Sequence, residues 1–132
     1  MTKGSFATVV DSFRATLSSL PDKRTGKNTR YEMLDAGLSA FSVFFTQTPS
    51  FLAHQRKMSD TKGRSNAQTL FGVHQIPSDN HIRDLLDGIS PTMLYPVFDD
   101  SLQLLQATEQ LSSFRSFADN LLMPLDGTEY FS

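Results

Sequence analysis

Apolar residues follow a helical spacing through much of the first half of this chain. Within residues 5–20 that spacing is kept by Phe6, Val9, Val10, Phe13, Leu17 and Leu20, which predicts an amphipathic helix. A basic, turn-rich segment without periodicity follows at 21–30. Thr29 and Glu32 stand in capping-box relation and are expected to open a second helix. That helix should end before Pro49, because the residue ahead of a proline avoids the helical region.

Three further helices are predicted in the middle of the chain. Ser50 is placed as the N-cap of FLAHQRKMSDTKG, which is expected to stop near Gly63. The segment NAQTLFG, residues 66–72, predicts a short helix that ends on its glycine. Ser78 is placed to cap a helix over Asp79–Leu86, whose leading acid suits the positive end of the helix.

The last third of the chain changes character. Ser90-Pro91 is typical of a helix start, and the apolar pattern continues to about Ser112, with Pro96 as a kink or a second start. The run NLLMPLD, residues 120–126, is strand-like and ends on an acid. Because one two-stranded hairpin is marginal in water, this strand is expected to be the first of a larger sheet.

These elements predict a mainly α fold with a helical region over 1–117 and the start of a second unit at 118–132. At 132 residues the chain is about one domain, large enough to bury a core. We interpret the phenylalanines on the helical stripes as core residues; they are Phe6, Phe13, Phe41, Phe44, Phe45, Phe51 and Phe71. His54, His74 and His81 lack paired spacing for zinc and are interpreted as surface or loop residues.

Charge is divided unevenly between the two halves. Residues 1–64 carry ten Lys/Arg and five acids, a net of +5, whereas residues 65–132 carry two Arg and nine acids, a net of −7. The basic half suggests a surface for a polyanion, although scattered solvated lysines explain it equally well. No cysteine, no apolar run near the roughly 18 residues of a membrane span and no secretory signal lead us to expect a cytoplasmic protein without membrane contact.

The segment 66–87 has the outline of a helix-turn-helix. Its second helix would present Asn80, His81 and Arg83 in the half that meets base edges or phosphates in such motifs. Four upstream cations could bind phosphates, which position a duplex without reading it; they are Arg56, Lys57, Lys62 and Arg64. The turn is longer than usual, so an ordinary pair of packed helices is the alternative interpretation.

Asp126 closes the apolar run and precedes Gly127. A carboxylate at a strand end can serve as a ligand for a hard cation such as Mg²⁺. An Asp-Gly turn is the simpler reading of the same two residues. One acid is too few for two-metal phosphoryl chemistry, which needs several converging carboxylates.

Residues 41–132 closely resemble the N-terminal part of DDE transposases of bacterial insertion sequences. The strings that carry the resemblance are SFLAHQR (50–56), KGRSNAQTLFG (62–72), IPSDNHIR (76–83) and LDGTEYFS (125–132). The resemblance implies a helical DNA-binding region followed by the first strand of a ribonuclease-H-like domain. It also implies that Asp126 is the first acid of an Asp-Asp-Glu triad, a ligand for the Mg²⁺ or Mn²⁺ that drives attack on a phosphodiester.

The remaining two acids of that triad have no counterpart in residues 1–125, so the expectation is a truncated front end of a transposase. Such a fragment should bind the DNA ends of an insertion sequence without cleaving them, and we expect no functional metal in it. An alternative is a helical interaction module that pairs with a full-length transposase as a regulator, or with itself. A decayed gene product with no present role is the third possibility.

Overall fold

A computed structural model describes residues 4–26, 29–61, 66–73, 75–122 and 127 of this chain. Within these residues the protein is mainly helical, as predicted, and its strands form one small antiparallel pair. The helices are α1 (Ser5–Ser18), α2 (Met33–Phe45), α3 (Phe51–Thr61), α4 (Asn66–Phe71), α5 (Asp79–Leu86) and α6 (Tyr95–Ala107). The short elements are the 3₁₀ helices η1 (Pro91–Leu94), η2 (Ser112–Phe114) and η3 (Phe117–Asp119), and the strands β1 (Arg115–Ser116) and β2 (Asn120–Leu121).

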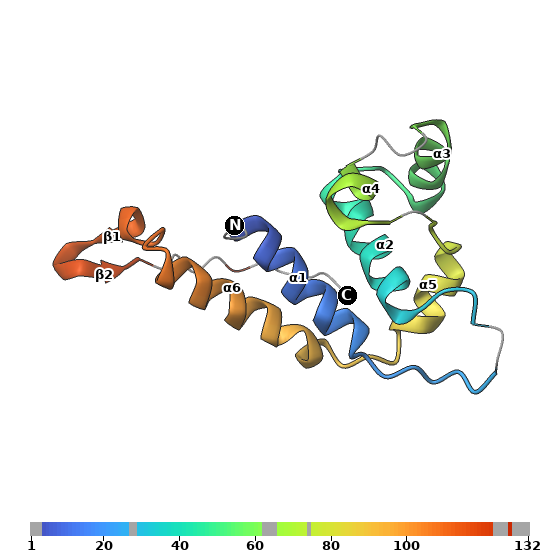
Figure 1. Ribbon diagram of the computed structural model, residues 1–132, viewed down its shortest axis with the longest axis horizontal. Coiled ribbons are helices and arrows are strands. Elements are labelled where there is room, and N and C mark those ends of the chain that lie inside the picture. The colour runs from blue at the N-terminus through green and yellow to red at the C-terminus, as the bar shows by residue number, and fades with distance from the viewer. Residues whose placement is uncertain (1–3, 27–28, 62–65, 74, 123–126, 128–132) are drawn as a thin grey trace.

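Two groups of helices make up the molecule. Figure 1 shows α2, α3, α4 and α5 gathered on one side, and α1 beside the long helix α6 on the other. Both views place α1 and α6 side by side, and α1 also packs against α2, so α1 joins the two groups. Helices α4 and α5 both pack against α2.

Local chemistry sets most helix boundaries where the sequence predicts them. The Ala53 N–H donates to Ser50 Oγ at 3.1 Å, so Ser50 caps α3. Gly72 follows α4 with φ +68°, a left-handed conformation that glycine adopts without strain. Ser78 caps α5 by accepting the His81 N–H at 3.4 Å. Pro96 proves to mark a second start, because η1 ends at Leu94 and Pro96 lies in the first turn of α6, which begins at Tyr95.

Two predicted boundaries were wrong. The capping box of α2 joins Glu32 and Asp35, with the Glu32 N–H donating to Asp35 Oδ2 at 2.9 Å; Thr29 takes no part in it. This places an acid in the first turn of α2, where the helix dipole favours negative charge. At the other end of the chain, α6 stops at Ala107 and not near Ser112, because Glu109 adopts a left-handed φ of 56° that cannot continue the helix.

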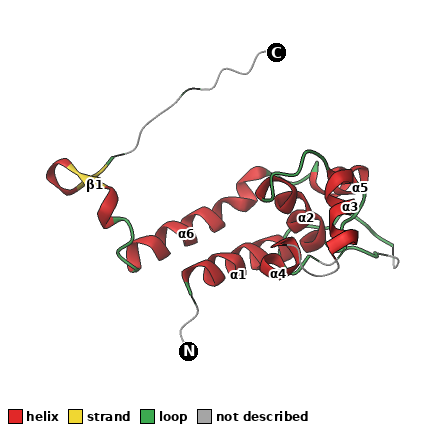
Figure 2. Ribbon diagram, turned by 90° about the horizontal axis from the view of Figure 1, so that it is seen from above, coloured by secondary structure: helices red, strands yellow, loops and turns green. Residues whose placement is uncertain are grey.

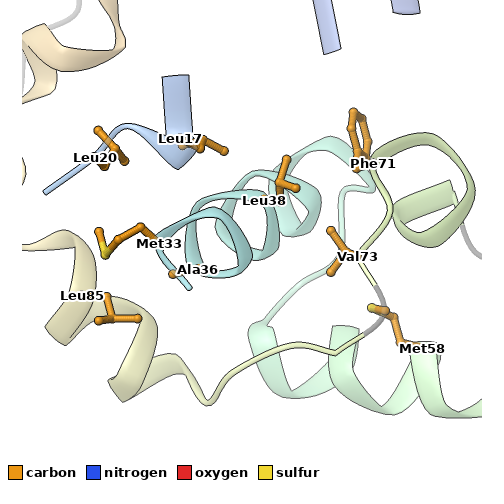
Figure 3. Close-up of a cluster of buried hydrophobic side chains, with 9 residues drawn as sticks. All are labelled: Leu17, Leu20, Met33, Ala36, Leu38, Met58, Phe71, Val73 and Leu85. Carbon is orange, nitrogen blue, oxygen red and sulfur yellow. The ribbon is translucent and has the colours of Figure 1, made fainter. Parts of the chain in front are cut away.

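The core lies where α2 meets its neighbours. Nine buried side chains form one cluster: Leu17, Leu20, Met33, Ala36, Leu38, Met58, Phe71, Val73 and Leu85. Figure 3 shows this cluster gathered around α2, with contributions from α1, α3, α4 and α5. Burying one such side chain contributes about 1.5–3 kcal/mol, so α2 is the element on which the fold depends most.

The expectation that the helical phenylalanines form the core holds for Phe71, with 3 % of its surface exposed, and in part for Phe13, which is partly buried against the core cluster. It was wrong for Phe44, Phe6 and Phe45, which are 77 %, 52 % and 46 % exposed. Phe6 and Phe45 do contact the ring of Phe71, with centroids 6.5 and 5.0 Å apart, so they lie at the edge of the core.

The C-terminal part of the described chain is a short hairpin. Strands β1 and β2 pair Arg115 with Leu121 and Ser116 with Asn120 across the turn at η3. Each residue of the two strands is exposed. The predicted strand over 120–126 begins here as β2, whereas residues 123–126 lie outside the described ranges.

Candidate nucleic-acid interface

Helix α5 presents the three predicted recognition residues. Ile82 and Leu85 bury one side of this helix against α2, leaving Asn80 and Arg83 exposed on the other. His81 is half-buried. The same outer surface also carries the exposed carboxylates of Asp79, Asp84 and Asp87. Because α5 and its C-cap Asp87 carry three acids to one arginine, they cannot by themselves supply the positive charge that a phosphate backbone requires.

The basic segment before α2 lies next to α5 and brings further cations to it. The ring of Tyr31 packs against the ring of His81, with centroids 6.0 Å apart. The Arg30 guanidinium lies over the Tyr31 ring, 5.4 Å from its centroid, which is a cation–π contact. Arg30 is therefore held beside the N-terminal half of α5, fifty positions away in the chain.

A second contact between the same two regions involves a glycine. The amine of Lys23 lies over Gly88, just after α5, at a place where an ideal Cβ would come within 1.5 Å of Lys23 Nζ. A side chain at position 88 would displace this lysine. The absence of a side chain at Gly88 thus lets Lys23 approach the end of α5, so Lys23 and Arg30 flank this helix at its two ends.

Arg24 organises the basic segment from within. Its guanidinium donates to both carboxylate oxygens of Asp22, the nearest contact being 2.7 Å, and to the Tyr31 carbonyl at 2.6 Å. The hydrogen bonds from Arg24 lower the pKa of Asp22 to about 2, and the pKa of Arg24 is raised in return. The ion pair therefore persists at physiological pH and fixes the carbonyl that precedes α2. Much of the charge of Arg24 is compensated locally.

Helix α3 carries the predicted phosphate-binding residues. Arg56 and Lys57 are exposed, whereas Met58 is buried in the core. Between these surfaces, the Gln55 amide donates to the carbonyls of Ile76 and Pro77, at 3.2 and 2.9 Å. Because those carbonyls lead directly into the Ser78 cap, Gln55 ties α3 to the start of α5. The other two predicted cations, Lys62 and Arg64, lie outside the described residues.

The segment between α4 and α5 differs from a short helix-turn-helix turn. Residues 72–78 separate the two helices, and Val73 and Pro77 within them are buried. Both helices pack against α2, so α2 organises the pair. The helix-turn-helix interpretation over 66–87 stays a prediction, with the recognition-type residues on α5 accessible and the connection anchored in the core.

The interpretation of His54 as a surface residue was wrong. Its side chain is 2 % exposed, and His54 Nε2 lies 2.9 Å from Ser42 Oγ. Because the Ser42 hydroxyl already donates to the Ser39 carbonyl, it accepts from the histidine, which assigns the proton to Nε2. Nδ1 then faces the hydroxyls of Thr48 and Thr46 at 3.3 and 3.4 Å.

This polar network joins the end of α2 to α3. Burial lowers the pKa of His54, and the nearby charge of Lys57 lowers it further, so the histidine is neutral at neutral pH. A neutral imidazole matches the donors and acceptors around it. Sequence spacing gave no signal of this role, because Ser42 and His54 belong to different helices.

The described residues contain no group of three or more His, Cys, Asp or Glu side chains placed to hold a metal ion. Asp126, the predicted metal ligand, lies outside the described residues, as does His74. None of the helices in the described ranges is long and apolar enough to cross a bilayer.

Sequence reasoning selected Asn80, His81 and Arg83 and missed the residues that join them. The missed group is Lys23, Arg30 and Tyr31, all from or next to the basic segment 21–30. That segment was recognisable as basic, but its position against α5 is shown only by tertiary contacts, those of Tyr31 with His81 and of Lys23 with Gly88. Comparison of the chain with protein-family models, with curated proteins and with solved structures finds no match.

Proposed function

We propose that this chain is the DNA-binding helical region of a DDE transposase, and that α5, the adjacent basic segment and α3 form its DNA-binding surface. The observation that carries the proposal is the contact of Tyr31 with His81. It gathers Arg30 beside the exposed Asn80 and Arg83 on a helix that is anchored by its opposite side.

The charges on this surface suggest that different residues contact the phosphates and the bases. The phosphate backbone dominates affinity for DNA, and Lys23, Arg30, Arg56 and Lys57 are the described cations that would contact it. Residues of α5 would read bases, where an asparagine pairs with adenine and an arginine with guanine. A carboxylate on the same helix can accept a hydrogen bond from the cytosine amine. The acids of α5, although they repel phosphates, could therefore contact bases.

The ribonuclease-H-like part of the proposal rests on the string LDGTEYFS alone. In it Asp126 would be the first catalytic acid and would bind Mg²⁺ or Mn²⁺. Since no other acid of residues 1–132 is assigned to the triad, we propose that this chain by itself binds DNA without cleaving it. A nicking assay with Mg²⁺ or Mn²⁺ should show no cleavage; activity that Asp126→Asn abolishes would contradict this.

The DNA-binding proposal is tested by fluorescence anisotropy. The probes are a duplex with the terminal inverted repeat of a related insertion sequence and a scrambled duplex of equal length. Arg83→Ala should weaken binding to the repeat by about tenfold, as expected for loss of a base contact worth about 1–3 kcal/mol, and should reduce the difference in affinity between the two duplexes. Lys57→Ala should weaken binding to both duplexes equally. It should also reduce the slope of log K against log salt concentration by about one.

Arg115→Ala is the matched control, because Arg115 is the other arginine of residues 65–132 and lies in the hairpin, away from α5. It should change neither affinity nor salt slope. Absence of binding to either duplex at low salt would refute the proposal, as would an equal loss from Arg83→Ala and Arg115→Ala.

A further inference from the structure

The basic segment before α2 is held in place by side chains and not by regular structure. It runs between two buried core residues, Leu20 and Met33. Among its described residues, 21–26 and 29–31, no main-chain N–H or carbonyl is hydrogen-bonded to another main-chain group. A segment of this kind ordinarily samples many conformations, because little offsets the entropy that is lost when it is ordered. The backbone alone therefore does not keep this segment beside α5.

Arg24 joins the two ends of the segment. Its Nη2 donates to Asp22 Oδ2 at 2.7 Å and to the Tyr31 carbonyl at 2.6 Å. Its Nε and its backbone N–H donate to Asp22 Oδ1 at 2.9 and 3.0 Å. The two oxygens of one carboxylate thus fix both the guanidinium and the backbone of Arg24, a geometry that suits the planar fork of an arginine. Arg24 and Tyr31 are half-buried, whereas the other described residues of the segment are exposed.

This link determines where the two cations that flank α5 lie. Tyr31, whose carbonyl accepts from Arg24, packs its ring against α5 and lies under the guanidinium of Arg30. Lys23, the residue before Arg24, extends its amine over Gly88, just after α5. The hydrogen bonds of Arg24 therefore hold the backbone from which Lys23 and Arg30 reach the helix.

The negative charge of Asp22 opposes this structural contribution. A carboxylate near a DNA-binding surface repels phosphates, so removing it ordinarily strengthens binding. Removing the Asp22 carboxylate also releases the Arg24 guanidinium and with it the segment. Cations that are already ordered do not have to be ordered when DNA binds, which favours affinity. The electrostatic and the positioning effects of Asp22 thus have opposite signs.

We propose that Asp22 and Arg24 are positioning residues of the DNA-binding surface, and that the Asp22 carboxylate raises the affinity for DNA although its charge opposes binding. The inference rests on the proposed function, because it assigns how the surface around α5 is ordered before DNA arrives. Neither residue has to contact DNA, since their effect passes through Lys23 and Arg30.

The test is fluorescence anisotropy with the inverted-repeat duplex and the scrambled duplex. Asp22→Asn should weaken binding to both by about three- to tenfold, the loss expected when released side chains must be ordered on binding. The ratio of the two affinities should stay the same, because phosphate contacts carry no sequence information. Arg24→Lys keeps the positive charge and loses the planar fork, so it should weaken binding to a similar degree.

Asp60→Asn is the matched control. Asp60 is an exposed acid of α3, the helix that also carries Arg56 and Lys57. This substitution removes the same charge as Asp22→Asn without touching the basic segment, so it should strengthen binding slightly. If Asp22→Asn strengthens binding as Asp60→Asn does, Asp22 acts through its charge alone and the proposal is overturned. Wild-type affinity in Arg24→Lys would overturn it as well, because a lysine would then suffice at that position.

NMR spectroscopy of the free chain separates this inference from the DNA-binding proposal. Nuclear Overhauser effects should connect the rings of Tyr31 and His81, whose centroids lie 6.0 Å apart. Asp22→Asn and Arg24→Lys should weaken these signals and Asp60→Asn should not, with the helicity of all three variants unchanged in circular dichroism. Unchanged signals in Asp22→Asn overturn the positioning role, whether or not the chain binds DNA. Weakened signals in a chain whose wild type binds neither duplex would refute the proposed function and the effect on affinity, and would retain the link between Arg24 and α5.

Discussion

Helices α2 and α6 are both thirteen residues long and both amphipathic, yet they have opposite surroundings. Helix α2 buries seven of its residues and α6 buries none. Four other helices pack against α2, whereas among the described elements α6 packs chiefly against α1 and η1. The comparison shows that helical periodicity predicts which side of a helix is apolar. It does not predict whether another element of the same chain covers that side.

Truncating one leucine on each helix tests whether α6 is less well covered than α2. Leu38→Ala, at a position 2 % exposed, should lower the free energy of unfolding by about 2–5 kcal/mol because it leaves a cavity in the core. Leu102→Ala, at a position 45 % exposed, should cost less than about 1 kcal/mol at low micromolar concentration. Urea denaturation of both variants provides the measurement. Equal costs for the two substitutions would show that α6 is as well covered as α2.

Two serines on α2 provide a finer test within the buried cluster. Both are fully buried, but Ser42 Oγ bonds to His54 whereas Ser39 Oγ has no hydrogen-bond partner among the described residues. Ser42→Ala should cost about 1–3 kcal/mol, because it leaves the His54 N–H buried without an acceptor. Ser39→Ala should be neutral or stabilising, since it removes a hydroxyl that gains nothing from burial. Thermal unfolding of the two alanine variants decides between these outcomes; similar losses would contradict the hydrogen-bond assignment.

The smallest effect expected is a pH dependence of the free energy of unfolding that comes from His54, between α2 and α3. The ordinary pKa of His54 is 6.5, and burial lowers its pKa in the folded protein. As pH falls through 6.5, the unfolded chain therefore takes up a proton that the folded protein does not, and the free energy of unfolding declines. Denaturation between about pH 7.5 and 5.5 should show this loss in the wild type and a weaker one in His54→Gln.

His81→Gln serves as the control for this titration, because His81 is half-buried beside Tyr31 and outside the network. It should keep the pH dependence of the wild type. A wild-type stability that is flat over this range would mean that His54 is not held neutral by its surroundings.

Local signals were enough for most of the helix boundaries. Ser50, Gly72 and Ser78 act through their own side chains or backbone, so their roles can be read from neighbouring residues. The start of α2 was misplaced because it depends on Asp35, while Arg24 fixes the preceding carbonyl from the basic segment. That second interaction belongs to the tertiary structure and is not encoded in the spacing.

In the candidate site, too, some features follow from local sequence and others depend on tertiary contacts. The residues of α5 were identifiable because a capped helix with an apolar side must present its remaining residues outward. The contribution of Arg30 and Tyr31 required knowledge of a contact between segments fifty positions apart. The burial of His54 likewise depends on how α2 and α3 pack, which residue type and spacing do not specify.

The hairpin beyond α6 has a practical consequence. Its strands are exposed throughout, and the ring of Phe117 at its turn is 91 % exposed. The chain contains no cysteine, so Phe117→Cys would create its one thiol. A fluorophore attached there would report on tumbling and on the proximity of other molecules while touching neither the core nor α5, which makes this tip a suitable handle for single-molecule work.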